Sequence, residues 1–471
     1  MTVRNMTASE AAARVANDLA ARRDEILECI AAFVRIPSIS AISPTSPAMH
    51  QALDFLRDRI AGSDLGNVQL LSAGSGHPTF YADWLGAPGA PTIMIYGHYD
   101  VQPAHRDDGW LSDPFMPEIR DDRIYGRGTS DVKGSTIIAF ETVLAWLRVA
   151  DGCPVNVKLF IEGEEEIGSP SLPTIVQQNR GLLAADAVLS ADGGRALPGF
   201  PSLYVGARGL ASLELTLTTA SSDLHSGRFG GATRNAIAEM ARLVSSLHHA
   251  DGSIAVAGFE DDMTPISPDD IKQATAFPFD AAEHYAGFHG VEGGDPARTP
   301  WERMTLYPTI EPNGIWGGYT GLGVKTVIPA MAHAKLTMRL VAGQDPARAR
   351  ARVETHLRAL LPEGVRLEVS HGGDARAFSL RLDHPLLLAA EEVVTLRRGR
   401  PPLRVRSGGT VPFTQIFQEV LGIDTLMFGL ATGDENAHAP NEFFRLEALD
   451  EGLATWPALL AKVGQLSAEA F

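Results

Sequence analysis

The sequence predicts an α/β domain, built on a mainly parallel sheet with helices on both faces, and a second, α+β domain inserted into it. Short apolar runs at residues 92–96, 155–161 and 187–189 are separated by helix-like segments such as 133–150. Strands that alternate with helices form parallel sheets covered on two sides. Near Arg208 the pattern changes to a strict alternation of apolar and polar residues, which predicts a different kind of sheet.

The first domain is expected to use both ends of the chain. The Ala-rich, periodic stretch from Ser9 to Arg35 stops at Ile36-Pro37 and predicts one long amphipathic helix. After about Asp383 the pattern of the first third returns, with a helix at 385–397 and an apolar strand at 424–430. Residues 1–207 and 384–471 are therefore expected to form one discontinuous domain.

Residues 208–383 are expected to form the inserted domain. Leu213, Leu215 and Leu217 alternate with polar residues, and 332–340 repeats this pattern, as half-buried antiparallel strands do. Between these strands lie a helical stretch, 232–247, and an irregular region rich in Pro, Gly and Asp, 251–302.

Length, composition and net charge exclude several classes of function. The chain has 471 residues, 45% hydrophobic and 21% charged, which predicts two or three folded domains. Its formal net charge of −17 has the wrong sign for nucleic acid or an anionic membrane surface. No apolar run approaches the ~20 residues of a membrane helix, and residues 1–13 lack the order of a secretory signal. Two cysteines, Cys29 and Cys153, suit a reducing compartment, so a cytoplasmic protein is expected.

Polar residues follow the predicted parallel strands, where ligands bind in such sheets. His98 and Asp100 follow the first strand, the acidic run Glu162–Glu166 the second and Asp192 the third. Alone, a pair such as His98 and Asp100 is more often an ordinary surface or core pair than a metal site, and Asp131 by itself is expected to cap the following helix. The acidic run is either a solvated loop or a group of carboxylates neutralised by cations. Carboxylates and imidazoles together suit a hydrolytic metal pair such as zinc.

Seven motifs occur in order along nearly the whole chain, and together they resemble the M20 metallopeptidase family. The resemblance is greatest to its dinuclear dipeptidases, the group of cytosolic nonspecific dipeptidase and the carnosinases. The motifs are GHYDVQP (97–103), YGRGTSDVKG (125–134), EGEEEIGS (162–169), DLHSGRFGG (223–231), KTVIP (325–329), RSGGTVPFT (406–414) and the segment around His438.

The resemblance implies two divalent metal ions, zinc first, with manganese or cobalt as alternatives. It makes His98 and Asp192 ligands of one ion, Glu166 and His438 ligands of the other, and Asp131 the bridge between them. Asp100 would orient His98, and Glu165 would act as general base towards water bridging the metals. Glu162 and Glu164 are expected only as solvated or supporting charge.

The resemblance also makes the inserted domain a lid and dimerisation domain. His225 would reach the active site of the partner subunit of a homodimer and steady the tetrahedral oxyanion. Five further residues would hold the small peptide substrate, and Arg339 offers a planar fork for its carboxylate. They are Thr326, Arg339, His371, Gly409 and Thr410.

The expected activity is hydrolysis of dipeptides that carry a free C-terminal carboxylate. Gly193-Gly194-Arg195 follows Asp192 where the dipeptidases usually carry polar and aromatic side chains, so an N-acyl-amino-acid amidohydrolase or a carboxypeptidase of the same superfamily remains the alternative. A catalytically silent binding protein is a second alternative, although every metal-ligand position is kept. Gly314–Gly323 lacks the ending of a phosphate-binding loop, and Cys29, among apolar residues, is expected in the core.

Overall fold

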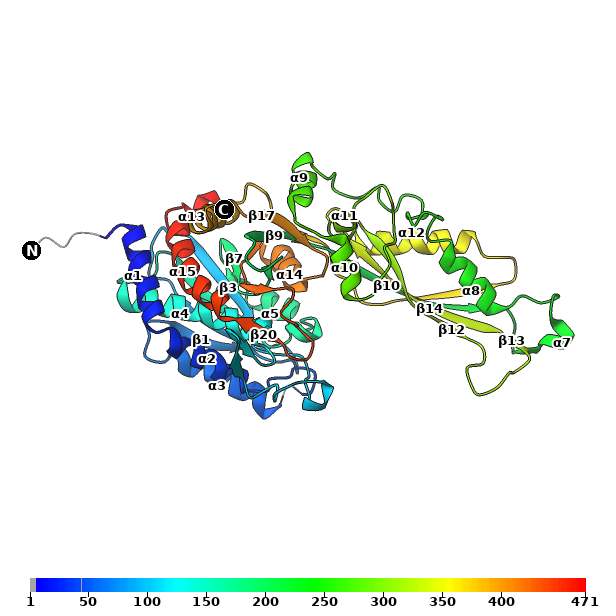
Figure 1. The fold of residues 1–471 in the computed structure, drawn as a ribbon, viewed down its shortest axis with the longest axis horizontal. Helices are drawn as coiled ribbons and strands as arrows, with labels where there is room; N and C mark the ends of the chain where they lie inside the picture. The colour runs from blue at the N-terminus through cyan, green and yellow to red at the C-terminus, as the bar shows by residue number, and fades with distance from the viewer. Residues whose placement is uncertain (1–5, 44) are drawn as a thin grey trace, which may run out of the picture. The chain divides into compact units, whose positions relative to one another are not determined.

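The computed structural model describes residues 6–43 and 45–471, so the first five residues of the stretch examined for a secretory signal lie outside it. The chain forms two compact units (Figure 1). The first unit comprises the chain up to Val205, Leu380–Val405 and Pro412–Phe471, and the inserted unit comprises Gly206–Ser379 and Arg406–Val411. The short segment Arg406–Val411 carries no sequence signal that would assign it to the inserted unit.

The main sheet of the first unit has four parallel strands at its centre, in the order β6 (Asn156–Glu162), β3 (Thr92–His98), β7 (Ala187–Ser190) and β18 (Thr425–Met427). The three strands predicted from the apolar runs are these central ones. The antiparallel strands β1 (Gly66–Leu71), β2 (Thr79–Trp84) and β9 (Ser202–Ala207) flank them. β1 and β2 carry no long apolar run, and the sequence did not reveal them.

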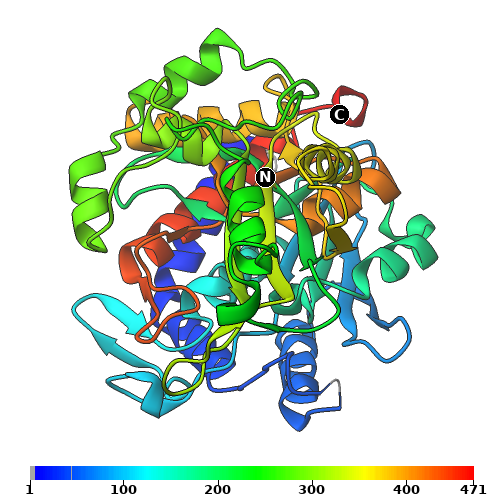
Figure 2. The ribbon, with the colours of Figure 1, turned by 90° about the vertical axis from the view of Figure 1, so that its right-hand side faces the viewer.

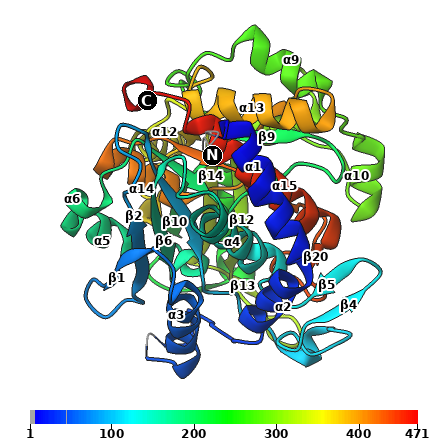
Figure 3. The same ribbon diagram turned by 90° about the vertical axis from the view of Figure 1, so that its left-hand side faces the viewer.

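Helices cover both faces of this sheet, as expected. Tyr96 of β3 stacks on Phe413, with ring centroids 3.8 Å apart, whereas a side chain at the next residue, Gly97, would meet Thr136. Because neighbouring strand residues point to opposite faces, α14 (Pro412–Leu421) and α4 (Gly134–Val149) lie on opposite sides. α1 (Ala8–Ala21) and α15 (Leu446–Val463) pack together with α4, and Figure 3 shows α1 beside α15.

The remaining elements of the first unit are shorter or peripheral. They are α2 (Arg23–Val34), α3 (Pro47–Ile60), β4 (Glu118–Arg120), β5 (Arg123–Tyr125), α5 (Leu172–Gln178), α6 (Arg180–Leu183), β8 (Gly194–Arg195), α13 (Pro385–Arg398), β17 (Leu403–Ser407), β19 (Ala431–Thr432) and β20 (Phe443–Arg445). Among the described residues, none of the helices combines the length and the hydropathy that a membrane span needs.

The inserted unit is built on an antiparallel sheet with strand order β12 (Thr309–Gly317), β14 (Met331–Leu340), β10 (Gly209–Thr218) and β15 (Arg366–His371). Leu213 of β10 pairs with Leu336 of β14. One face packs on α8 (Ala236–Ser245) and α12 (Pro346–Ala359), which is seen end-on in Figure 2. The alternating pattern predicted this sheet.

Its other elements are β11 (Leu224–His225), α7 (Ser226–Phe229), α9 (Pro268–Ala276), α10 (Ala281–Gly287), α11 (Pro300–Thr305), β13 (Val327–Ile328) and β16 (Phe378–Ser379).

Two expectations about helices were wrong. The stretch 9–35 forms two helices, α1 and α2, that break at Arg22, where φ is −105° and ψ is 15°. Buried apolar residues continue at helical spacing on both sides of the break, so periodicity could not reveal it. The region 251–302 contains the short helices α9 and α10 and the start of α11, each capped at its N-terminus by a side chain.

Both cysteines are free thiols in the structure. Cys153 is buried and Cys29 is partly exposed, and burial raises the pKa of each thiol to about 12. Neither is a nucleophile at neutral pH. Cys29 was expected in the core and is instead partly exposed.

His384 makes the stability of the first unit sensitive to pH. It is 1% exposed, and its Nδ1 accepts a hydrogen bond of 3.2 Å from the backbone N–H of Leu386 at the start of α13. Burial lowers the pKa of His384 below its ordinary value of 6.5, although Asp424 opposes this. The unfolded chain therefore takes up the proton first as the pH falls, and stability is lost below about pH 6.5.

We expect His384→Asn to reduce this loss, because an asparagine oxygen keeps the helix cap but does not titrate. The measurement is the midpoint of thermal unfolding of both proteins between about pH 8 and pH 5. Each unit of pKa depression corresponds to about 1.4 kcal/mol. Parallel profiles for the two proteins would contradict the assignment.

Candidate metal centre

The parallel strands bring the predicted site residues to one edge of the sheet. β3 ends at His98, which pairs with Glu162 at the end of β6, and Tyr96 pairs with Ser190 at the end of β7. Because the carboxyl ends of these three strands are level, the residues that follow them meet in space. This is the position at which open α/β sheets bind ligands.

Five of the predicted residues form two overlapping groups of possible metal ligands. His98, Asp131 and Asp192 form one group, and Asp131, Glu166 and His438 form the other. Within each group the ligand atoms lie within 4.8 Å of one another.

Asp131 belongs to both groups through different oxygens. Its Oδ1 lies 3.2 Å from Nε2 of His98, and its Oδ2 lies 3.0 Å from Nε2 of His438. The carboxylate therefore stands between the two imidazoles, as a bridging ligand does. Burial would raise the pKa of Asp131, but hydrogen bonds with His438 and His98 hold it well below its usual range.

His98 is oriented by Asp100, and both are fully buried. Nδ1 of His98 lies 3.0 Å from the Asp100 carbonyl oxygen and 3.4 Å from Oδ1 of its carboxylate. Nε2 therefore faces Asp131, and also Asp192 at 4.0 Å. Burial would lower the pKa of His98, but Asp100 and Asp131 raise it well above its ordinary value.

Glu166 is held by Gln102, a residue of the first motif that the sequence analysis did not single out. Oε2 of Glu166 accepts a hydrogen bond of 2.9 Å from the Gln102 amide and lies 3.0 Å from Nε2 of His438. The backbone N–H of Glu166 donates to Oδ2 of Asp100 at 3.1 Å. Asp100 thus connects the segments that carry His98 and Glu166.

Glu165 lies beside both groups, in a short 3₁₀ turn that begins at this residue. Burial raises the pKa of Glu165 well above its ordinary value, and the carboxylates of Asp192, Asp131 and Glu166 add to this while His98 opposes it. Burial likewise raises the pKa of Asp192 to about 6. A carboxyl group with a raised pKa beside the ligands is suited to carry a proton.

Two carboxylates of the acidic run are not solvated, which corrects one of the two roles expected for them. Glu162 is 2% exposed and accepts a hydrogen bond of 2.6 Å from the Tyr96 hydroxyl. Burial raises the pKa of Glu162 to about 8. Glu164 is 4% exposed and accepts hydrogen bonds of 2.8 Å from the backbone N–H groups of His77 and Ser171. Their role as supporting groups fits these contacts.

The donor set fits two divalent ions. Three carboxylates and two imidazoles suit borderline cations such as zinc, which accept both nitrogen and oxygen ligands. The buried Oδ1 of Asp100 has no hydrogen-bond partner in the described structure, and it faces the His98 nitrogen that points away from the ligand atoms. A carboxylate at this place is the usual partner of a metal-bound histidine.

In the inserted unit, Arg339 and Thr410 lie together. Nη1 of Arg339 donates a hydrogen bond of 2.8 Å to Oγ1 of Thr410. Arg208 was not among the substrate-binding residues predicted from the sequence, although the change of pattern begins near it. Nε of Arg208 donates to the carbonyl oxygen of Gly408 at 3.0 Å, so two arginines hold the segment that contains Gly409. Burial and the neighbouring Arg339 lower the pKa of Arg208 to about 10, and it stays charged at neutral pH.

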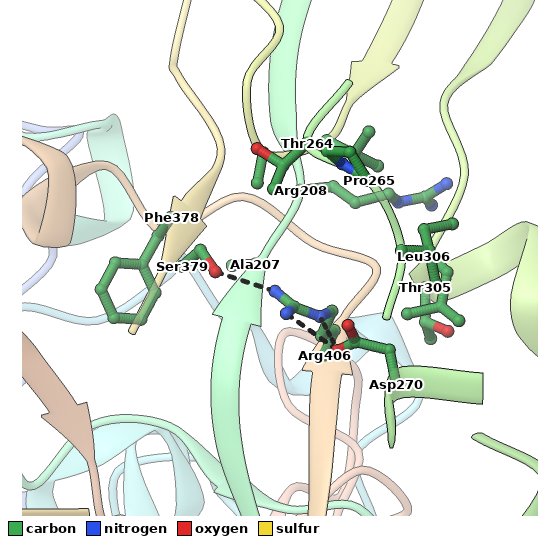
Figure 4. A pocket seen from close by; sticks show the side chains of 13 residues that line it. Ala207, Arg208, Thr264, Pro265, Asp270, Thr305, Leu306, Phe378, Ser379 and Arg406 are labelled. Atoms are coloured by element: carbon green, nitrogen blue, oxygen red, sulfur yellow. Dashed lines mark hydrogen bonds and ion pairs between the residues drawn. The ribbon is translucent and has the colours of Figure 1, made fainter. Parts of the chain in front are cut away.

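A cavity of about 70 Å³ lies behind this segment (Figure 4). Arg406 crosses it and donates hydrogen bonds of 3.0 Å to Oδ1 of Asp270 and to Oγ of Ser379. The volume has room for a few water molecules but not for a peptide. We therefore regard this cavity as part of the support for the Arg406–Val411 segment rather than as a substrate site.

His225 and Thr326 lie in a second place within the inserted unit. His225 of β11 pairs with Val327 of β13, and the carbonyl oxygen of Thr326 accepts a hydrogen bond of 3.0 Å from Ser226. His225 is exposed, and its Nδ1 accepts a hydrogen bond of 3.0 Å from the N–H of Gly227. In the neutral ring the proton is therefore on Nε2, which leaves this atom as a donor.

The two places lie at opposite ends of β14. Two residues separate the end of β13 from Met331, the first residue of β14, whereas Arg339 is next to the last residue of β14. Eight residues at about 3.3 Å each separate these positions by roughly 26 Å. A dipeptide is only about 7 Å long. Within one chain, His225 and Arg339 are therefore not brought to the same small substrate.

His371 is not brought to Arg339 either. The register pairs His371 with Leu213, on the sheet face that carries the apolar core, and its Nε2 lies 3.9 Å from Oε2 of Glu354 in α12. Arg339 lies on the opposite, polar face of the sheet. The role of His371 in substrate binding stays a prediction.

Comparison with known proteins agrees with this site. A model of peptidase family M20/M25/M40 matches residues 94–462. The chain is 30% identical over 423 residues to the Beta-Ala-His dipeptidase of Homo sapiens, with 88% of this chain and 83% of that protein covered. It is 28% identical over 462 residues to the Cys-Gly metallodipeptidase dug1 of Schizosaccharomyces pombe, with 95% and 97% covered. The crystal structure of the M20 family metallo-carboxypeptidase Sso-CP2 from Sulfolobus solfataricus has a TM-score of 0.80 and 31% identity, with 94% and 100% covered.

Carboxylates and imidazoles gathered at the carboxyl edge of a parallel sheet suit a metal-binding site. The chain belongs to peptidase family M20/M25/M40. The family resemblance read from the seven motifs is therefore confirmed, and the protein is an enzyme that hydrolyses peptides.

The shared position of Asp131 predicts how many ions each variant retains. We expect Asp131→Ala to lose both ions, because it removes a ligand from each group, and Asp192→Ala to lose one. Elemental mass spectrometry of proteins loaded with zinc and freed of excess metal measures this. Glu141→Gln is the control, because Glu141 lies in α4, pairs with Arg22 and Arg59 and contacts none of the ligands, and it should retain both ions. Equal losses in the Asp131 and Asp192 variants would contradict a shared ligand.

Proposed function

We propose that this protein is a dinuclear metal-dependent dipeptidase that cleaves dipeptides with a free C-terminal carboxylate. The observation that carries the proposal is the position of Asp131, whose two oxygens face His98 and His438 at 3.2 and 3.0 Å. One carboxylate shared by two groups of ligands is the arrangement expected of a two-metal hydrolytic site.

In the proposed mechanism, the two groups would hold divalent ions, which would supply Lewis acidity for water and for the scissile carbonyl. Glu165 takes a proton from the attacking water and passes it to the leaving amine. Its surroundings support this role, since burial raises its pKa and no hydrogen bond to a described residue occupies its carboxylate. Asp100 keeps the ring of His98 in one orientation throughout.

The C-terminal carboxylate of the substrate is proposed to bind beside Arg339 and Thr410. A guanidinium group offers two parallel donors to a carboxylate. Arg208 adds a second positive charge nearby, and no described carboxylate forms an ion pair with it. Two adjacent arginines without a carboxylate partner favour an anionic group of the substrate at this place.

We further propose that the active unit is a homodimer and that His225 acts on the substrate of the partner subunit. The separation of His225 from Arg339 along β14 supports this, because one chain does not bring both to a dipeptide. His225 presents its Nε2 donor to solvent, as a group that stabilises an oxyanion in another subunit must. Large apolar side chains around it are exposed, which is typical of an interface. They are Phe229, Ile237, Ile315, Trp316, Tyr319, Leu322, Val324 and Met331.

The relatives support dipeptides as substrates. Two proteins with 30% and 28% identity, matched over most of their length, are named as dipeptidases for Beta-Ala-His and for Cys-Gly. These two peptides differ in the length of the first residue and in the side chain of the second. Both peptides have a free C-terminal carboxylate, which is the group that the site proposed at Arg339 would bind. A cytoplasmic location and zinc as the ion remain predictions.

A carboxypeptidase is the second candidate, and a structural feature beside Asp192 favours it. Gly193 and Gly194 carry no side chain, and Arg195 is turned into an ion pair with Glu451. None of the three residues therefore presents a side chain that would stop a longer peptide on its N-terminal side. The relative Sso-CP2, with 31% identity, is named as a metallo-carboxypeptidase.

A substrate panel separates the two candidates. We expect the zinc-loaded protein to cleave free dipeptides at least tenfold faster, in kcat/KM, than the same dipeptides acetylated at the amino group or converted to C-terminal amides. A lower kcat/KM for the C-terminal amides alone would favour the carboxypeptidase, provided that acetylated and longer peptides are cleaved as fast as free dipeptides. Chromatography of the released amino acids measures the rate of cleavage for each substrate.

The partner role of His225 predicts complementation between two inactive variants. Glu165→Gln and His225→Ala should each lose most turnover and keep both ions. In a refolded equimolar mixture, half of the dimers would pair a Glu165→Gln chain with a His225→Ala chain and contain one intact site, so about a quarter of the wild-type activity should return. Native mass spectrometry of the mixture, with one variant carrying a tag, serves as the exchange control because it detects the mixed dimers directly. No recovery, with exchange demonstrated, would contradict action between subunits.

A further inference from the structure

We propose that Glu442, together with Glu435, is a positioning residue that fixes the segments bearing Asp131 and His438 to each other and so sets the geometry of the metal group formed by Asp131, Glu166 and His438. The inference rests on the proposed function, because it concerns the same metal site. Neither glutamate is a member of the metal-ligand groups or one of the site residues predicted from the sequence.

The carboxylate of Glu442 is surrounded by the segment that ends at Asp131. Glu442 is fully buried. Its Oε2 accepts hydrogen bonds from Nη1 of Arg127 at 2.7 Å and from the N–H of Gly128 at 2.9 Å. Its Oε1 accepts hydrogen bonds from the N–H groups of Ser130 at 2.9 Å and of Asp131 at 3.1 Å. Four donors from one short segment thus converge on a single side chain.

The backbone around Glu442 reinforces this attachment. The carbonyl oxygen of Glu442 accepts a hydrogen bond of 2.9 Å from the N–H of Gly126. Directly after it, β20 pairs with β5, with Phe443 opposite Tyr125. Two segments that are 311 positions apart in the chain are therefore joined through both main chain and side chain.

Glu435 attaches the other end of the His438 segment to the same place. It is fully buried, and its Oε2 accepts a hydrogen bond of 2.7 Å from the hydroxyl of Ser130. Its Oε1 accepts one of 2.9 Å from Nη1 of Arg445. The segment that carries His438 is thus anchored on both sides, at Glu435 and at Glu442, to the residues directly before Asp131.

His438 depends on these anchors, because little else holds it. Its side chain is 55% exposed, so core packing does not fix it. Its only polar contacts in the described structure are with Asp131 and Glu166, the other members of its metal group. The distance between His438 and Asp131 is therefore controlled by the buried carboxylates behind them.

The position requires a carboxylate of this length. Each oxygen of Glu442 accepts two hydrogen bonds, whereas glutamine would offer an NH₂ group to two of the donors and leave them unpaired. Groups that orient metal ligands in this way typically change metal affinity 10- to 100-fold when they are replaced.

The test compares Glu442→Gln with Glu141→Gln, a matched control. Glu141 is also fully buried and paired with arginines, Arg22 and Arg59, but it lies in α4 and contacts none of the ligands. Zinc affinity is measured by competition with a chromogenic chelator, and the visible spectrum of the cobalt-loaded protein reports ligand geometry. We expect Glu442→Gln to lower the affinity for one of two ions at least tenfold and to alter the cobalt spectrum, with both unchanged in Glu141→Gln.

Each result decides between the hypotheses. Two ions bound by Glu442→Gln with wild-type affinity and spectrum would overturn this inference and leave the proposed function intact. Unaltered protein that binds fewer than two ions would overturn the proposed dinuclear site itself. Should Glu442→Gln fail to fold, Ser130→Ala carries the same test, because it removes only the hydroxyl bound by Glu435. A loss of affinity at one ion would then support the inference, and unchanged affinities would contradict it.

Discussion

The carboxylate of Asp131 is the point on which the first unit depends, because it must face two imidazoles at once. Its oxygens lie 3.2 Å from His98 and 3.0 Å from His438. These histidines come from the end of a central strand and from a segment near the C-terminus. The level ends of the parallel strands place His98 at the edge of the sheet where the other ligands gather. His438 is brought to Asp131 by a long-range attachment between the two segments that carry these residues.

Acidic groups gathered in this way repel one another, and the structure counters the repulsion in distinct ways. The ligands Asp131 and Glu166 face histidines and the Gln102 amide. The carboxylates behind them are paired with donors: Glu162 with the Tyr96 hydroxyl, and Glu164 with backbone N–H groups. Glu165 is left with its pKa raised by burial and by its acidic neighbours. One run of four carboxylates therefore serves different roles according to what each side chain contacts.

Short-range patterns were enough to predict the central strands and the alternating strands β10 and β14, and the family resemblance of seven short motifs supplied the five possible metal ligands that the structure brings together. Each of these depends on a few consecutive residues. The break at Arg22 could not be predicted, because the apolar spacing continues across it. The burial of Glu162 and Glu164 depends on donors from distant segments, and the contacts of Arg208 with Gly408 join residues 200 positions apart. The helices α9 and α11 did leave a local signal, a capping Ser267 or Thr299 before a proline, which the Pro- and Gly-rich composition of the region obscured.

The assignment of Arg406–Val411 to the inserted unit has a consequence for the order in which the protein is made. The chain passes between the two units four times, at the boundaries after Val205, Ser379, Val405 and Val411. Domains generally fold as the ribosome delivers them, from the N-terminus onward. Here the inserted unit lacks the partner of Arg339 until Thr410 has been synthesised, and the first unit lacks its strand β18 and its helix α15 until still later. Neither unit is a single continuous stretch of sequence: the inserted unit is complete only once Val411 has been synthesised, and the first unit only once α15 has followed.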